Sequence, residues 1–161
     1  MMRAIEIKSI VNEYNSIEEL DIASKNLCLQ AFEAAKSAYA PYSSFKVGAA
    51  LLLANGVVVK GSNQENAAYP SGLCAERVAL FYANSTYPDQ AVTAIAITAI
   101  YKGLQVKQPI SPCGSCRQVI AETKHRFGNR ITIFLSSSKK IWEITDSDSL
   151  LPLSFSESDL K

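Results

Sequence analysis

Three cysteines and one glutamate lie in two short segments whose residue types suit a metal centre. The first segment is Cys74-Ala75-Glu76-Arg77, and the second is Pro112-Cys113-Gly114-Ser115-Cys116-Arg117. Cys113 and Cys116 have the spacing of residues that share one side of a helix, so they can bind the same ion. Cys74 and Glu76 are closer in sequence, but side chains in the first turn of a helix lean back over its N-terminal end. Both can therefore reach an ion at a helix start.

This set of ligands predicts a catalytic zinc site. Three thiolates leave the fourth tetrahedral position of zinc open for water, whereas a structural zinc normally has a fourth protein ligand. A carboxylate that lies beside the water without binding the metal can carry protons. A Cys or His ligand, one residue and then Glu, followed later by Pro-Cys-x-x-Cys, is typical of zinc deaminases. The single histidine, His125, lies near the far end of an expected helix, so the three-cysteine form is predicted.

Charge balance adds two further candidates. Three thiolates on a divalent cation give a net negative site, which makes a bound water harder to deprotonate. Arg77 and Arg117 directly follow the two cysteine segments, and we expect at least one of them to balance this charge rather than to be a solvated surface side chain. The fourth cysteine, Cys28, lies beside Leu27 and Leu29 and is interpreted as a small buried hydrophobic residue.

Two other classes of protein use parts of the same pattern. Cys113 and Cys116 alone resemble a thioredoxin-type redox pair, which would form a reversible disulfide and would not need Cys74 or Glu76. A zinc-stabilised binding module would need the metal for its fold, and Glu76 would be dispensable. Neither alternative explains why Cys74-x-Glu76 precedes a Pro-Cys-x-x-Cys segment.

These residues must be positioned by helices and strands, and the expected order of those elements predicts an α/β protein with a mixed five-stranded sheet covered by helices. Ser16 and Glu19 form a capping-box signature for the first helix, and Ala40-Pro41 ends it. Asn55-Gly56 predicts a type I′ hairpin turn, and Pro112 suits the first turn of a helix. The expected elements in chain order are a helix over 16–39, strands over 45–54 and 57–63, a helix over 74–86, a buried strand over 91–100, a helix over 112–127, and strands over 130–135 and 140–145.

Composition and charge bound the remaining possibilities. The 161 residues are 48% hydrophobic and 19% charged, which predicts a single folded domain over 1–161 with an N-terminal arm over 1–15 and a frayed tail over 156–161. Sixteen basic against fifteen acidic residues give no electrostatic footprint for nucleic acid or an anionic membrane. We find no apolar run long enough to span a membrane and no secretory signal, so a cytoplasmic location with reduced thiols is expected.

At these residues the chain resembles the cytidine deaminase family, in its small homotetrameric, three-cysteine form. The resemblance extends from about Ala38 to Phe155 and implies a three-layer α/β/α fold with helices on both faces of the sheet. Five segments carry it in order: Ala40-Pro41-Tyr42-Ser43-Ser44-Phe45 with Val47-Gly48-Ala49-Ala50-Leu51, Asn63-Gln64-Glu65-Asn66-Ala67, Tyr69-Pro70 leading to Cys74–Arg77, Pro112–Gln118 with Glu122, and Leu150-Leu151-Pro152 with Phe155.

The resemblance implies a role for each matching residue. Cys74, Cys113 and Cys116 would bind one zinc ion per subunit. Glu76 would take a proton from the attacking water, deliver it to ring N3, and later protonate the departing amino group. The remaining residues would contact the substrate. Asn63 and Glu65 would hydrogen-bond the sugar 3′-hydroxyl, Phe45 would pack beside the ligand, and the Ala75 backbone would bond the pyrimidine ring. Tyr69 and Phe155 would either reach the active site of a neighbouring subunit or serve only in core or interface packing.

The function implied is hydrolysis of cytidine and deoxycytidine to uridine and deoxyuridine with release of ammonia, as in pyrimidine salvage. Active sites shared between the subunits of a homotetramer are implied as well. A related deaminase acting on a cytosine-containing antibiotic nucleoside would use the same ligands and stays open. A polynucleotide editor is disfavoured, because the chain has no basic strip with interleaved aromatic residues.

Overall fold

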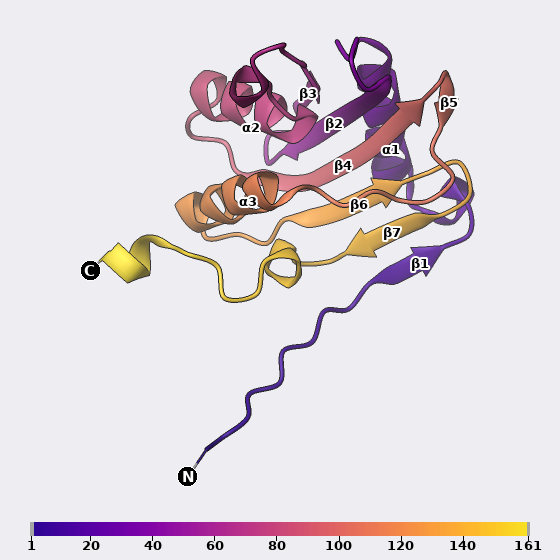
Figure 1. Ribbon diagram of the computed structural model, residues 1–161. Helices are drawn as coiled ribbons and strands as arrows, with labels where there is room; N and C mark the ends of the chain where they lie inside the picture. The colour runs from indigo at the N-terminus through magenta and orange to yellow at the C-terminus, as the bar shows by residue number, and fades with distance from the viewer. Residues whose placement is uncertain (1, 161) are drawn as a thin grey trace.

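A mixed β-sheet separates two helical layers in the computed structural model, which describes residues 2–160 (Figure 1). The strand order is β1-β7-β6-β4-β2-β3, with β5 paired to β4. β4 and β6 are parallel, and the other pairs are antiparallel. The strands are β1 (Asn12–Tyr14), β2 (Phe45–Leu53), β3 (Val58–Ser62), β4 (Val92–Tyr101), β5 (Leu104–Gln105), β6 (Thr132–Ser136) and β7 (Ile141–Ile144).

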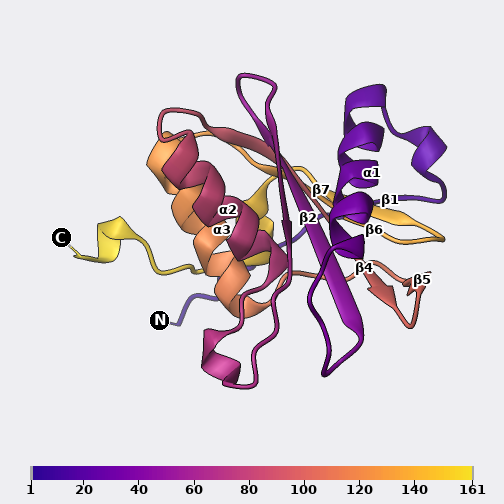
Figure 2. The ribbon, with the colours of Figure 1, turned by 90° about the horizontal axis from the view of Figure 1, so that it is seen from above.

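The helices lie on both faces of the sheet, as Figure 2 shows. α1 (Ile22–Lys36) covers one face, and α2 (Ala75–Thr86) and α3 (Gly114–Phe127) lie side by side on the other. Two apolar clusters fill the spaces between the layers. One contains Ala79, Leu80 and Ile120 of α2 and α3, and the other contains Leu27 and Ala31 of α1. The predicted three-layer architecture is confirmed.

Over residues 2–160 the sheet has seven strands, so the expected number of five was wrong. The five expected strands are all present, and two short ones are added. β5 folds back on the end of β4, and β1 lies within the expected N-terminal arm, where it pairs with β7. Glu13 of β1 accepts hydrogen bonds from Lys140 Nζ (2.9 Å) and Trp142 Nε1 (2.6 Å). These long-range partners stabilise a strand too short to show a hydrophobic period.

The first helix begins later than the capping box predicted. Ser16 caps only a 3-10 turn, Ile17–Glu19, and Leu20 then has an extended backbone. Asp21 is the N-cap of α1, since its carboxylate accepts hydrogen bonds from the backbone N–H groups of Ala23 (2.9 Å) and Ser24 (3.0 Å). A second good N-cap residue five positions downstream therefore overrides the first.

The hairpin between β2 and β3 does not have the predicted type I′ turn, which needs positive φ at both central residues. Gly56 has φ 82°, but Asn55 is not among the residues with positive φ. The Gly56 N–H donates to Leu53 O (2.9 Å), and the Leu53 N–H donates to Val57 O (2.9 Å). This is the three-residue loop in which a β-turn is followed by a left-handed glycine.

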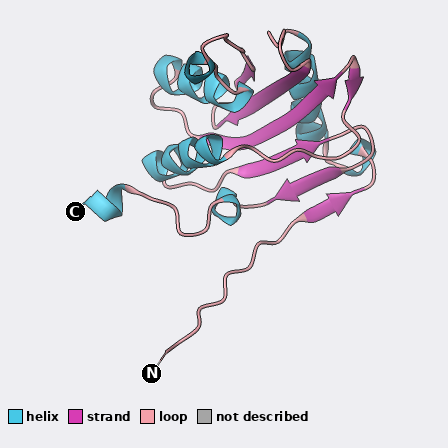
Figure 3. Ribbon diagram, viewed as in Figure 1, coloured by secondary structure: helices cyan, strands magenta, loops and turns pink. Residues whose placement is uncertain are grey.

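The two ends of the chain differ in how they are held. Residues 2–11 run as a loop away from the sheet (Figure 3), with Ile5 and Ile10 exposed and Ser9 Oγ bonded to Ser149 O (2.8 Å). In the tail, Glu157–Leu160 form a 3-10 turn and Ser156 is buried; fraying of the tail stays a prediction, and residue 161 lies outside the described residues. Over residues 2–160, no helix is both long and apolar enough to cross a membrane.

Candidate active site

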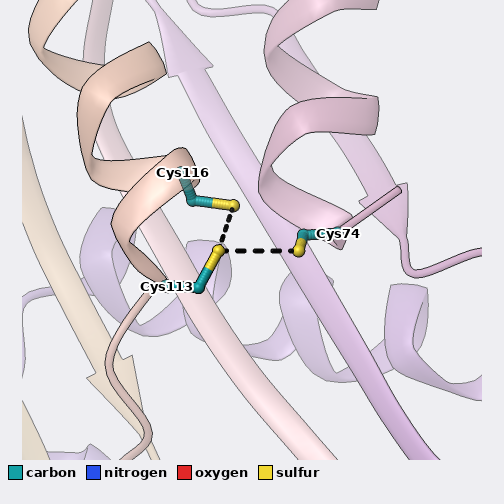
Figure 4. A group of neighbouring side chains, drawn as sticks. All are labelled: Cys74, Cys113 and Cys116. Carbon is teal, nitrogen blue, oxygen red and sulfur yellow. Dashed lines mark hydrogen bonds between the residues drawn. The ribbon is translucent and has the colours of Figure 1, made fainter. Parts of the chain in front are cut away.

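The three sulfur atoms predicted to bind metal meet between the N-terminal ends of α2 and α3 (Figure 4). Cys74 is the N-cap of α2 and Cys113 is the N-cap of α3, and Cys116 lies in the first turn of α3. The Sγ atoms of Cys74 and Cys113 are 3.8 Å apart, and those of Cys113 and Cys116 are 3.5 Å apart. All three cysteines are free, so neither pair is a disulfide.

This spacing fits a tetrahedral zinc ion. With Zn–S bonds of about 2.3 Å, the sulfurs of a tetrahedral site are about 3.8 Å from one another. The surroundings of Cys74 also favour the thiolate form of its sulfur. Hydrogen bonds from Cys116, Arg77 and Cys113, with the positive charge of Arg77, lower its pKa to about 5 against the opposing effect of burial. The donor set and its geometry therefore suit zinc, and a redox pair of Cys113 and Cys116 would not require Cys74 in the cluster.

Glu76 is the buried acid of the site. Its residue is 4% exposed, and its Oε2 atom is buried with no hydrogen-bond partner among the described residues. Burial raises the pKa of its carboxyl, and the nearby Cys74 thiolate raises it further. An unpartnered buried oxygen is costly, so its presence here marks a group kept free for a ligand or a proton.

The two candidate arginines have different positions. Arg77 Nη2 donates to Cys74 Sγ at 3.8 Å, which places a guanidinium against the sulfur cluster. Arg117 instead bonds backbone oxygens, with Nε on Pro112 O and Nη1 on Leu150 O, both at 2.9 Å. Arg77 is therefore the cation that faces the thiolates, and Arg117 ties the segment before Cys113 to the C-terminal part of the chain.

A cavity of about 660 Å³ opens beside the sulfur cluster. Its volume is within the range typical of small-molecule sites. Glu76 and Cys74 lie at one part of its wall, and Phe45, Asn63, Glu65 and Tyr69 belong to the rest. The structure thus brings most of the predicted ligand residues around one space. The complete lining is Tyr42, Ser43, Phe45, Val47, Asn63, Gln64, Glu65, Asn66, Tyr69, Gly72, Leu73, Cys74, Glu76, Arg77, Ile110, Ser111 and Cys113.

Asn63 is held by the first residues of β2, and Glu65 is held by the loop before β2. Asn63 Oδ1 accepts the Val47 N–H (2.7 Å), and its Nδ2 donates to Phe45 O (3.0 Å). Glu65 accepts the Tyr42 N–H (2.9 Å) and the hydroxyl of Ser43. The Ser43 bond contributes most to lowering the pKa of Glu65, so this carboxylate is ionised at neutral pH.

The other predicted substrate contacts are spread more widely. Phe45 lines the cavity, with its ring centroid 6.1 Å from that of Tyr101. Ala75 is fully buried at the start of α2, where backbone N–H groups have no partner within the helix. Tyr69 is 83% exposed at the cavity rim, and Phe155 is 60% exposed and does not line the cavity.

Sequence reasoning assigned no individual site role to several cavity-lining residues, among them Tyr42, Ser43, Ile110 and Ser111. Ser111 and Ile110 directly precede the Pro112 segment, so their nearness to the metal motif was a usable signal. The backbone and hydroxyl donors of Tyr42 and Ser43 gave no such signal, because their partner Glu65 is more than twenty residues away. Cys28 lies on α1 across the sheet, and burial raises its pKa to about 12, as expected for an inert thiol.

Comparisons with known proteins agree with this geometry. The family described as the cytidine and deoxycytidylate deaminase zinc-binding region matches residues 22–128. The cytidine deaminase of Halalkalibacterium halodurans is 45% identical over 139 residues, which cover 83% of this chain and 95% of that protein. That of Sporosarcina psychrophila is 42% identical over 137 residues, covering 84% and 93%. A crystal structure of cytidine deaminase from Burkholderia pseudomallei has a TM-score of 0.68 at 38% identity and covers 81% of this chain and 97% of that chain. The chain belongs to the cytidine and deoxycytidylate deaminase family.

Proposed function

We propose that the protein is a hydrolase that converts cytidine and deoxycytidine to uridine and deoxyuridine with release of ammonia. The observation that carries this proposal is the buried Glu76 carboxyl, whose Oε2 has no partner among the described residues, beside three converging cysteine sulfurs on one wall of a nucleoside-sized cavity. Similarity to cytidine deaminases over most of the chain supports it. A related deaminase for a cytosine-containing antibiotic nucleoside is the second candidate, since the same residues would serve it.

The residues divide the chemistry between them. Zinc held by Cys74, Cys113 and Cys116 supplies the Lewis acidity that makes a water molecule nucleophilic near neutral pH. Glu76 accepts a proton from that water and delivers it to ring N3, and the water oxygen forms a bond to C4. Glu76 then takes the remaining proton from the new C4 hydroxyl and gives it to the amino group, so that the C4–N bond breaks, C4=O forms and ammonia leaves. The pKa of the Glu76 carboxyl is raised by burial, which suits a group that must both accept and donate a proton.

The charges of the cavity favour a nucleoside over a nucleotide. Glu65 and Glu76 are its two carboxylates, and Arg77 is the sole cation in the lining of the described cavity. Arg77 donates from Nη2 to the Cys74 sulfur, so the charge of this guanidinium already faces the thiolates. A phosphate near ionised Glu65 would meet repulsion without compensation. Turnover of cytidine that exceeds turnover of cytidine monophosphate by at least about a hundredfold is the expected result.

Assembly and location belong to the proposal as well. We propose a homotetramer with one zinc per subunit, in which Tyr69 and Phe155 reach a neighbouring site. The exposure of these aromatic rings in the single chain supports a role between subunits. Free cysteines arranged as metal ligands are typical of a reducing compartment, which supports a cytoplasmic location and a part in pyrimidine salvage. Mass measurement in solution and the metal content per chain test the assembly.

The decisive experiment compares zinc content and cytidine turnover in the wild type, Glu76→Gln and Glu122→Gln. Loss of a general acid–base group costs about two to four orders of magnitude in rate, and zinc should be retained in Glu76→Gln because the three sulfurs remain. Glu122, an exposed residue of α3, is the matched control and should leave both properties unchanged. Full activity of Glu76→Gln would contradict the mechanism. A wild type that forms a reversible disulfide and binds no zinc would favour the redox alternative.

A further inference from the structure

The loop before β2 presents an unusual set of donors to a single carboxylate. Glu65 Oε2 accepts the backbone N–H groups of Tyr42 (2.9 Å) and Ser43 (3.3 Å), and Glu65 Oε1 accepts the hydroxyl of Ser43. The Ser43 oxygen itself accepts the N–H of Phe45 (3.0 Å), so its own proton is directed at Glu65. The Ser43 hydroxyl therefore links the Phe45 backbone to the Glu65 carboxylate, and the direction of its hydrogen bond to Glu65 is fixed.

The backbone of this loop is strained in a way that maintains the arrangement. Ser44 has φ 56°, a left-handed conformation uncommon for a residue other than glycine, and its N–H donates to Ala40 O at 3.1 Å. Such conformations persist when the surroundings determine them, and they are concentrated at functional sites. Here the closed loop turns the Tyr42 and Ser43 donors toward Glu65.

Glu65 and Asn63 keep a few hydrogen-bonding positions unused, and these are available to a ligand. An ionised carboxylate has about four acceptor positions, and the loop fills three of those of Glu65. Asn63 uses one N–H and one lone pair on the β2 backbone, which leaves one N–H and one lone pair. One ligand hydroxyl can donate to Glu65 and accept from Asn63, whereas an ether oxygen at that point would leave the free acceptor position of Glu65 without a donor.

We propose that Ser43 is a positioning residue that restricts Glu65 to a single acceptor direction and thereby makes the site select nucleosides with one free sugar hydroxyl at that point. The inference rests on the proposed function for the identity of the ligand as a nucleoside and of the hydroxyl as the 3′ group. Ser43 acts through Glu65 and takes no part in the proton transfers of Glu76. It therefore affects binding of the sugar rather than the chemical step.

Kinetics of four proteins test this inference with cytidine and 3′-deoxycytidine: wild type, Ser43→Ala, Ser43→Thr and Ser85→Ala. Ser43→Ala should raise KM for cytidine about five- to tenfold, the scale of one ordinary hydrogen bond, with kcat within about twofold. It should leave KM for 3′-deoxycytidine unchanged, because that nucleoside lacks the hydroxyl. Ser43→Thr keeps an Oγ and should restore KM. Ser85 lies near the C-terminal end of α2, and Ser85→Ala is the neutral control.

A measurement without substrate separates the inference from the proposed function. The pKa of Glu65, followed by carboxyl ¹³C NMR in the free protein, should rise in Ser43→Ala and return toward the wild-type value in Ser43→Thr, because the Ser43 hydroxyl contributes most to lowering it. A wild type that does not deaminate cytidine would contradict the proposed function, and this titration would still decide the role of Ser43. An unchanged Glu65 pKa, or an equal loss of kcat with both nucleosides, would overturn the inference.

Discussion

The position of α2 depends on a close approach to Gly61 of β3, and this contact predicts how the metal site can be damaged from a distance. A Cβ atom built on Gly61 would lie 2.5 Å from Ala75 O and 2.6 Å from Ala79 N, both backbone atoms of α2. Ordinary contact begins at 3.4 Å, so the first turn of α2 must retreat by about 0.9 Å to accept an alanine. Cys74 and Glu76 flank Ala75 and must move with it.

Gly61→Ala should therefore lower stability and damage the site together. Overpacking costs about 1–3 kcal/mol, which lowers Tm by about 2–12 °C for a chain of this length. A displacement of nearly 1 Å can cost about a hundredfold in rate, and the Cys74 sulfur must still meet that of Cys113 for zinc to bind. We expect weaker zinc affinity, measured by chelator competition, and kcat/KM lower by about ten- to a hundredfold.

Gly48→Ala is the matched control on the opposite face of the sheet. Its Cβ would lie 2.1 Å from Ala31 O and 2.3 Å from Ala35 N of α1, which carries no metal ligand. This variant should lose at least as much stability as Gly61→Ala, while the folded fraction keeps wild-type zinc affinity. If Gly61→Ala lowers Tm but binds zinc as tightly as wild type, the contact with Gly61 does not set the position of Cys74.

Three further predictions concern the thiols and the polar contacts around α3. Cys113→Ser should lose bound zinc, measured by elemental analysis, whereas Cys28→Ala should keep it because Cys28 lies across the sheet. Desolvation opposes ionisation of Asp146, but its hydrogen bond from Lys124 lowers its pKa overall, so its contribution to stability is present above the ordinary pKa of 3.8 and is lost as pH falls. Asp146→Asn should therefore lower Tm at pH 7, with a gap to wild type that narrows below about pH 4 in calorimetry. Arg117→Gln should leave two backbone carbonyls unpaired and cost about 1–3 kcal/mol in denaturant unfolding without loss of zinc.

Local signals in the sequence predicted the parts of the fold that depend on local physics. Pro112 and the apolar run over 91–100 located α3 and β4, and the cysteine spacing identified all three sulfur atoms that the structure brings together. β1 could not be predicted, because its Glu13 is held by Lys140 and Trp142, which lie more than 120 residues away. For the same reason nothing adjacent to Arg117 indicated that its guanidinium binds Leu150 O instead of facing the thiolates.

The capping box shows the limit of local reasoning at short range. Ser16 does accept a backbone hydrogen bond, from Glu18 at 3.1 Å, so the signature correctly located a helical turn. It could not show how far the helix continued, since Asp21 offers two backbone acceptor bonds and begins the longer helix. Two adjacent signals of similar strength are decided by packing, and the helix that Asp21 begins buries Leu27 and Ala31 against the sheet.

The two helices that form the site begin without the usual side-chain cap. α1 is capped by a carboxylate, whereas α2 and α3 each begin at a cysteine that makes no capping hydrogen bond. A missing cap costs about 0.5–2 kcal/mol per helix. The uncapped helix N-termini instead stabilise the thiolate form of the cysteines. Unpaired N–H groups and the positive end of each helix dipole face the sulfurs, which favours the thiolates that a metal needs as ligands. Because the three ligands come from two helices, metal binding would join α2 to α3 and offset the cost of the missing caps. Cys74 and Cys113 therefore both weaken the two helix N-termini and form the metal site.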